Sequence, residues 1–215
     1  MKSMQLINIF TTFFHYLVHP FRTHEIFMYP ERFPNENLLR LSPYESLSTS
    51  WIFVLINSIF RIIILNFILV LFYDLARESD FAIMDLINLE EVPALYFIVL
   101  SSIIDVIFYP LFGIFLIQFW ELIIRFFGKL NGVQGDLTQK AADIMSVSMS
   151  SKILSIVPFI GGGLESLASL ILMYAGLRTQ LNASVSLSLC ILFTPVLLLL
   201  AAAVMIFMFV VVLSV

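Results

Sequence analysis

Charged residues are scarce in this chain. Lysine, arginine, aspartate and glutamate make up 12% of the 215 residues, whereas hydrophobic residues make up 60%. A soluble domain of this length carries roughly a quarter charged residues, so the composition excludes an ordinary water-soluble globular domain. Several apolar runs are long enough to cross a bilayer. The sequence therefore predicts an all-α integral membrane protein.

Cysteine is also scarce, and the sequence motifs of common catalytic and binding sites are missing. The single Cys190 cannot form an intramolecular disulfide, and no cluster of cysteine and histidine suggests a metal. His15 and His19 have the i, i+4 spacing of a metal-binding pair, but no third ligand is evident. There is no Gly-x-Ser-x-Gly elbow, no zinc-protease motif, no phosphate-binding loop and no basic patch for nucleic acid. We expect a protein that is not an enzyme, with no catalytic residue, cofactor, metal or nucleic-acid partner.

The apolar runs predict five membrane spans in a domain of residues 49–215, after an N-terminal segment of residues 1–48. The expected spans are about 49–73, 93–127, 141–160, 164–181 and 183–215. The second run, at about 50 Å as one helix, exceeds the roughly 30 Å hydrocarbon core and should tilt, kink at Pro110 or continue into water. The last run contains Pro195, so one tilted or interrupted helix and two short spans both stay open.

The apolar stretch 141–181 is too long for one span. Its 41 residues would extend about 60 Å as a single helix. Three successive glycines, Gly161, Gly162 and Gly163, lie in its middle, shortly after Pro158. Glycine allows the positive φ angles that a tight turn needs, so these four residues predict a hairpin turn between two spans.

The N-terminus predicts an amphipathic helix lying in the membrane interface. Read as a helix, polar side chains line one side and apolar side chains the other, and Pro20 should end it. The polar side comprises Asn8, Thr11, Thr12, His15 and His19, and the apolar side comprises Ile7, Phe10, Phe14, Leu17 and Phe21. Such a helix lies on the bilayer rather than crossing it.

The distribution of basic residues predicts the orientation. With five spans and a cytoplasmic N-terminus, eight basic residues lie on the inner side and only Arg77 lies on the outer side. The eight are Lys2, Arg22, Arg32, Arg40, Arg125, Lys129, Lys140 and Arg178. The positive-inside rule therefore places the N-terminus in the cytoplasm and the C-terminus outside.

Three segments resemble the Yip1-domain membrane proteins. They are "SKILSIVPFIGGG", "LASLILMYAGLR" and "ASVSLSLCILFTPVLLLL", and "YLVHPFRTHEIF" before the first span is similar to the entry of prokaryotic members. The resemblance covers roughly residues 15–200 and implies a five-span fold. The eukaryotic branch implies binding of prenylated Rab-type GTPases, but its Asp-Leu-Tyr-Gly-Pro motif and long hydrophilic N-terminus are absent here. The chain resembles a prokaryotic-type member instead.

Four ionisable residues fall inside the expected spans and are candidate site residues, because a charge at membrane depth is costly unless partnered. Arg61 and Asp105 each lie about twelve residues into antiparallel neighbours, which predicts an ion pair. Lys152 could reach Glu165 just past the glycines. Either pair could lock helices together or line a path for an ion or substrate. For the second pair, a lipid-headgroup site is a third alternative.

These observations predict a non-enzymatic protein that scaffolds other membrane proteins or shapes the local bilayer, as the Yip1 resemblance implies. The alternative is a subunit of a transporter or lipid-translocating complex, with a polar path through the helices. The expected partners are the lipid bilayer and another membrane protein or a second copy of the chain. The expected location is the cytoplasmic membrane of a prokaryote.

Overall fold

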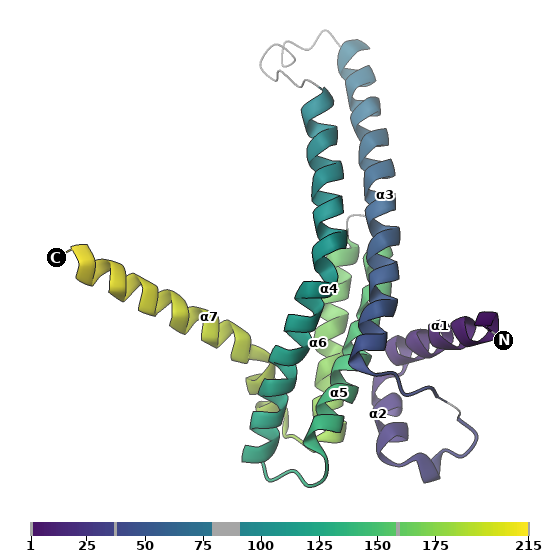
Figure 1. Cartoon of the computed structure of the whole chain (residues 1–215), viewed down its shortest axis with the longest axis vertical. Helices are drawn as coiled ribbons and strands as arrows, with labels where there is room; N and C mark the ends of the chain where they lie inside the picture. The colour runs from purple at the N-terminus through teal and green to yellow at the C-terminus, as the bar shows by residue number, and fades with distance from the viewer. Residues whose placement is uncertain (1, 37, 79–90, 158–159, 215) are drawn as a thin grey trace.

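The computed structural model describes residues 2–36, 38–78, 91–157 and 160–214, and no strand occurs among them. The predicted all-α class is confirmed in this part of the chain. Figure 1 shows a long antiparallel helix pair, a shorter hairpin packed along one part of it, and two terminal helices that point away on opposite sides. The elements are α1 (Lys2–Val18), α2 (Pro20–Met28), η1 (Pro30–Arg32), α3 (Pro43–Glu78), α4 (Glu91–Leu130), α5 (Leu137–Ser148), η2 (Met149–Ile156), α6 (Gly161–Gln180) and α7 (Val185–Ser214).

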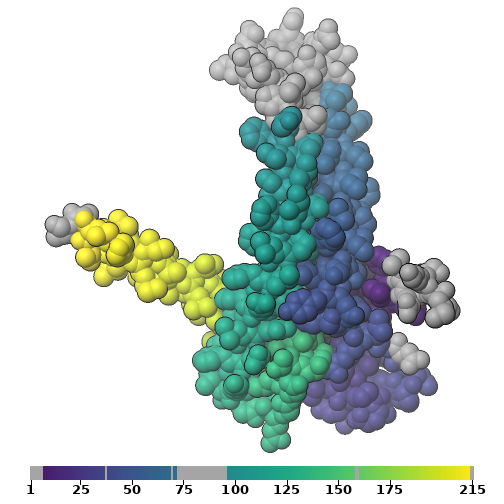
Figure 2. Space-filling view, viewed as in Figure 1, coloured from purple at the N-terminus to yellow at the C-terminus, as the bar shows by residue number. Residues whose placement is uncertain are grey.

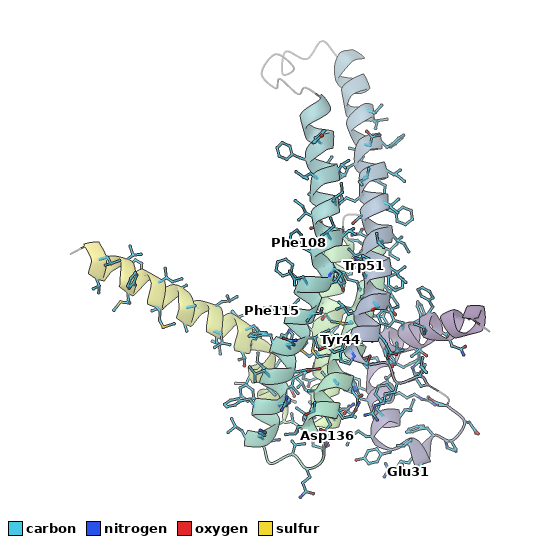
Figure 3. All side chains as sticks on the ribbon, in the orientation of Figure 1. Glu31, Tyr44, Trp51, Phe108, Phe115 and Asp136 are labelled. Carbon is cyan, nitrogen blue, oxygen red and sulfur yellow. The ribbon has the colours of Figure 1, made fainter. Side chains whose placement is uncertain are left out.

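Helices α3 and α4 form the long pair and contain the first two predicted spans. The indole nitrogen of Trp51 on α3 donates to the carbonyl of Val106 on α4 at 2.8 Å, which joins the pair near its middle (Figure 3). Helix α4 continues through Pro110 as one helix. Side chains such as Phe108 and Phe115 point outward from it and are exposed (Figure 3). Residues 79–90 of the acidic segment between the two helices lie outside the described part.

Helices α5, η2 and α6 form the predicted hairpin. Asp136 caps α5, because its carboxylate accepts the backbone N–H groups of Thr138 and Gln139 at 2.8 and 3.3 Å. After Ser148 the chain tightens into the 3-10 helix η2, which packs between α3 and α6. The hairpin ends beside residues 61–65 of α3, whereas α3 continues to Glu78.

The predicted role of the glycines in this hairpin is wrong. Gly161, Gly162 and Gly163 form the first turn of α6 rather than the turn before it, and positive φ angles among described glycines occur at Gly132 and Gly135. Gly161 is needed for another reason. A Cβ there would lie 2.6 Å from the carbonyl oxygen of Leu154 and 2.8 Å from that of Ser155. Pro158, the fourth predicted turn residue, lies outside the described residues.

This close approach predicts opposite effects at two adjacent glycines. Gly161→Ala should lower the thermal unfolding midpoint, because two backbone carbonyls must move and overpacking costs about 1–3 kcal/mol. At Gly162 a Cβ meets nothing within 4 Å, so Gly162→Ala should leave the midpoint unchanged or raise it, since alanine favours a helix by up to about 1 kcal/mol. Thermal unfolding of the two variants in detergent measures the difference. Equal midpoints would contradict the packing of η2 against α6.

The predicted N-terminal helix exists as α1 and ends before Pro20, which begins α2. Its burial differs from the predicted two-sided pattern, because Phe13 and Tyr16 are fully buried and Phe13 stacks on Phe53 of α3 at 5.9 Å. The predicted apolar residues Ile7 and Phe14 are 63% and 57% exposed, so the helix bundle does not cover this side of α1. Helix α1 therefore packs one apolar side on the helix bundle and leaves a second one uncovered.

Helix α7 is a single helix containing Pro195, which excludes two short spans in that run. Its first turns pack on α4 and α6 through residues such as Ile191, and the rest stands away from the bundle (Figures 1 and 2). Three helices of the described chain are long and apolar enough to cross a membrane: Pro43–Ile68, Tyr96–Leu130 and Val185–Leu213. Five spans are not confirmed, because α5 has only 12 residues and α6 carries both Glu165 and Arg178.

Candidate functional site

The four ionisable residues singled out in the sequence lie in two ion pairs near the end of the hairpin. A guanidinium nitrogen of Arg61 lies 3.0 Å from the Asp105 carboxylate, which joins α3 to α4. The Lys152 ammonium lies 2.8 Å from the Glu165 carboxylate, which joins η2 to α6. The structure thus brings together the residues that were paired from sequence, while the assignment of these pairs as a functional site stays a prediction.

Neighbouring groups hold both cations in place. The second terminal nitrogen of Arg61 donates to the Ser101 hydroxyl at 2.7 Å. The Lys152 ammonium lies 4.9 Å from the centre of the Tyr109 ring, within range of a cation–π attraction. The two pairs differ in exposure. The side chains of Lys152 and Glu165 are 19% and 23% exposed, whereas Asp105 is 54% exposed.

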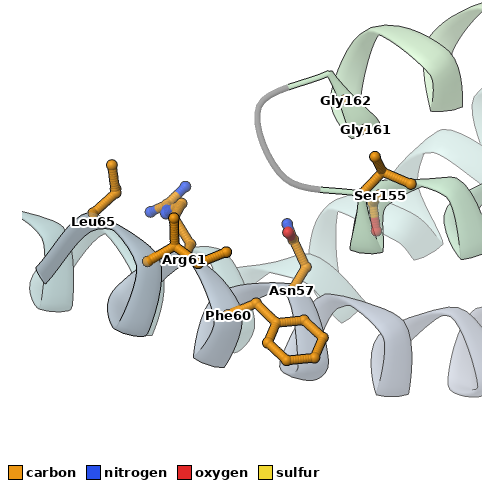
Figure 4. Close-up of a pocket in the computed structure, with 9 residues that line it drawn as sticks. Asn57, Phe60, Arg61, Leu65, Ser155, Gly161 and Gly162 are labelled. Atoms are coloured by element: carbon orange, nitrogen blue, oxygen red, sulfur yellow. The ribbon is translucent and has the colours of Figure 1, made fainter. Parts of the chain in front are cut away.

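Two adjoining clefts of about 300 and 290 Å³ open beside these pairs. They share Asn57 of α3, Ser155 of η2 and Gly162 of α6, and we call them together the tip cleft. One of the two is lined by Arg61 and the other by Asp105, Lys152 and Glu165. Figure 4 shows Asn57 and Arg61 on α3 facing the start of α6 across the first of them. The tip cleft is the largest concentration of charge within the predicted spans.

Away from the tip cleft, the serines of the hairpin bond to one another or to backbone. The hydroxyls of Ser46 and Ser146 lie 2.7 Å apart, and those of Ser148 and Ser169 lie 2.9 Å apart. Ser50 donates to the Met149 carbonyl at 3.0 Å. Because the partners of these serines are protein groups, this part of the hairpin is a set of direct helix contacts.

A second polar cluster, which the sequence analysis missed, joins the N-terminal segment to the hairpin. Asp143 of α5 is 1% exposed, and both of its carboxylate oxygens accept from the Arg40 guanidinium. The amides of Gln139 and Gln180 donate to the same carboxylate at 3.1 and 3.2 Å. The amide nitrogen of Gln180 also lies 3.1 Å from Nδ1 of His24. We call Arg40, Asp143, Gln180 and His24 the basal cluster.

His24 is fully buried between α2 and α6. Burial lowers the pKa of His24 from 6.5 to about 4, although the Asp143 charge and the Leu172 carbonyl act in the opposite direction. The Nδ1 atom accepts from Gln180, so the neutral ring carries its proton on Nε2, which has no hydrogen-bond partner within the described part of the chain. Gly176 makes room for this ring, since a Cβ there would lie 2.9 Å from Nε2.

The buried histidine predicts a loss of stability in acid. Because His24 titrates at 6.5 when unfolded and at about 4 when folded, the unfolded chain binds the extra proton first. Stability should fall by about 3 kcal/mol as the pH drops from 6.5 to 4. His24→Asn should flatten the unfolding midpoint across this range, whereas His19→Asn, which removes an exposed imidazole, should keep the wild-type decline. Parallel declines in all three proteins would contradict this assignment.

One residue of the basal cluster, Asp143, could have been identified from the sequence. Asp143 falls within the span predicted at 141–160, where an acidic residue needs a partner. Its partner Arg40, and His24, which joins the cluster through Gln180, lie more than 100 residues earlier in the chain, and nothing in the local pattern connects them to Asp143. Gln180 carries no charge and gave no signal.

The described residues contain no group of three histidine, cysteine, aspartate or glutamate side chains that could hold a metal. The rings of His15 and His19 are 5.2 Å apart, and His15 bonds to the Thr23 hydroxyl at 3.2 Å. Comparison of the chain with protein-family models, with curated proteins and with solved structures finds no match in any of the three.

Proposed function

We propose that this chain is a non-enzymatic membrane protein, similar to the Yip1-domain proteins, that binds another membrane protein or a second copy of itself through α7. The observation that carries the proposal is the exposure of this helix. The most apolar 18 residues of α7 include none that is buried in the chain. A helix that crosses a bilayer alone can be covered by lipid, but multi-span proteins gain stability by packing such helices against others.

The composition of α7 supports a protein contact. Ala201, Ala202 and Ala203 give it a run of small side chains about halfway along, with longer apolar side chains on both sides. Small residues allow the backbones of two helices to approach closely, which is the main source of helix attraction in lipid. A partner helix would therefore fit at this run.

The arrangement of the basic residues supports a cytoplasmic N-terminus. Figure 1 shows that α2, the end of α4, the start of α5 and the end of α6 meet at one end of the molecule. Arg22, Arg125, Lys129, Lys140 and Arg178 belong to these segments. By the positive-inside rule this end faces the cytoplasm. The C-terminus lies outside if α3, α4 and α7 cross, whether or not the hairpin also crosses. A prokaryotic cytoplasmic membrane fits this proposal.

The test is purification of the tagged chain in mild detergent and mass spectrometry of the intact assembly. We expect a stoichiometric second membrane protein or a dimer. Replacing Ala201, Ala202 and Ala203 together by leucine keeps α7 apolar but blocks close approach, and should reduce the bound fraction at least tenfold. Val204→Leu, at an exposed neighbouring position, is the control. A wild-type protein that stays alone, or a triple variant that keeps its partner, would overturn the proposal.

The second candidate function is lipid translocation, and the tip cleft favours it. Asp105 is half exposed within a predicted span, and a charge in that position needs water or a polar ligand beside it. Against a continuous path, the serines along the rest of the hairpin bond within the protein. Transfer of a fluorescent lipid between the leaflets of reconstituted liposomes would support this candidate over the first.

A further inference from the structure

The tip cleft has an apolar rim around a charged interior. Phe60, Ile104 and Phe112 line it and are 42%, 45% and 63% exposed, so they face the phase that surrounds the helices. The ion pairs and Asn57 line the same space. A cleft of this construction suits a molecule with a polar head and an apolar body, because both parts meet matching surfaces.

The charges in the tip cleft balance. It holds two cations, Arg61 and Lys152, and two anions, Asp105 and Glu165. An anionic ligand would be attracted by one pair member and repelled by the other. A ligand that carries one charge of each sign can place its phosphate toward the cations and its amine toward the carboxylates.

Arg61 and Asp105 retain room to bind. Their side chains are 35% and 54% exposed, and their contact runs through one guanidinium nitrogen and one carboxylate oxygen. The other carboxylate oxygen of Asp105 can accept from an amine. The remaining donor capacity of the guanidinium can serve a phosphate oxygen.

Asn57 adds a polar group without a partner in the described chain. It lies on both parts of the tip cleft, faces Ser155 and the start of α6 (Figure 4), and makes no hydrogen bond among the described residues. An amide has two donors and an acceptor, and the side chain of Asn57 is only partly buried, so these groups are available to a ligand. A ligand that fills the cleft would satisfy them.

We infer that the tip cleft binds the headgroup of a zwitterionic phospholipid, with the phosphate near Arg61 and Asn57, the amine near Asp105, and the acyl chains along the rim. The site goes beyond the α7 contact and rests on no part of it. It also adds detail to the second candidate function, lipid translocation, because it provides a headgroup-binding site within the predicted spans.

The experiment is release of the purified protein from bilayers of equal parts phosphatidylethanolamine and phosphatidylglycerol, followed by mass spectrometry of retained lipid. The wild type should retain the zwitterionic lipid at least fivefold over the anionic one. Asn57→Leu should reduce that retention at least fivefold, because it removes a group that bonds to the ligand but to no described residue. Asn66→Leu, at an exposed position of the same helix outside the cleft, should retain lipid as the wild type does.

A charge variant tests the selectivity. Asp105→Asn leaves the cleft with one excess positive charge, so the preference should shift toward phosphatidylglycerol. Equal retention of both lipids by the wild type, or a preference for the anionic lipid, would overturn the inference. Unchanged lipid retention by Asn57→Leu would also overturn the inference. This variant keeps the test decisive if Asp105→Asn fails to fold. Binding of a partner protein through α7 is measured in a separate purification experiment, so the two proposals can fail independently.

Discussion

Arg40→Ala is expected to destabilise the protein by about 3 kcal/mol, the lower end of the range for removal of one member of a buried ion pair, because the Arg40 side chain is itself 43% exposed. The cost arises because the Asp143 carboxylate is 1% exposed and would lose its counter-charge. Two amide donors, from Gln139 and Gln180, would remain, and neither carries charge. For a chain of this length the unfolding midpoint should fall by about 10 °C.

The matched control is Arg22→Ala. Arg22 also lies in the N-terminal segment and also pairs with a carboxylate, that of Glu36, but the two side chains are 55% and 28% exposed. An exposed pair contributes about 0–1 kcal/mol, so this variant should shift the midpoint by no more than about 3 °C. The two arginines are similarly exposed, at 43% and 55%, whereas Asp143 is 1% exposed and Glu36 is 28% exposed, so the comparison isolates the burial of the carboxylate. Similar shifts in both variants would show that the burial of Asp143 does not strengthen its ion pair with Arg40.

A conservative replacement sharpens this prediction. Arg40→Lys should recover less than half of the lost midpoint, because arginine contacts both carboxylate oxygens of Asp143 through two nitrogens and an ammonium cannot reproduce that geometry. Limited proteolysis gives a second readout. Loss of the Arg40 contact should expose residues 1–42 to cleavage before the rest of the chain, since this contact fixes the N-terminal segment to α5.

Sequence reasoning located the apolar helices well, because apolar run length is a local property. The boundaries of α3 and α4 include the spans predicted at 49–73 and 93–127, and α7 lies within the run predicted at 183–215. The ion pairs followed from the same logic. Counting residues along two antiparallel helices was enough to bring Arg61 opposite Asp105. Neither step needed knowledge of how distant segments pack.

Features that depend on packing could not be predicted in this way. The glycine run suggested a turn, whereas Gly161 is small because α6 begins against the carbonyls of η2. The α1 helix was expected to have one apolar side, yet Phe13 and Tyr16 find a second buried surface on the bundle. The basal cluster joins α2, α5 and α6 through side chains far apart in sequence. Local periodicity contains no information on any of these contacts.

Reversing the charge of Arg61 is expected to have an equally large effect. Arg61→Asp places a second carboxylate opposite Asp105 and leaves both without a counter-charge. An unpaired acid at the centre of a span costs about 2.5–3.5 kcal/mol, so two together should cost about 5–7 kcal/mol. The yield of folded protein after size-exclusion chromatography should fall at least tenfold.

The double variant Arg61→Asp with Asp105→Arg has the composition of the wild type and restores an ion pair between α3 and α4. It should return the folded yield to within about threefold of the wild type, and the excess over the two single variants measures the coupling between the residues. Failure of the double variant to recover would show that each charge is held by its own surroundings, such as the Ser101 hydroxyl beside Arg61, rather than by the other. Recovery of yield without recovery of lipid retention would separate the two roles of this pair. The helices would then need only opposite charges, whereas the headgroup would need the cation on α3 next to Asn57.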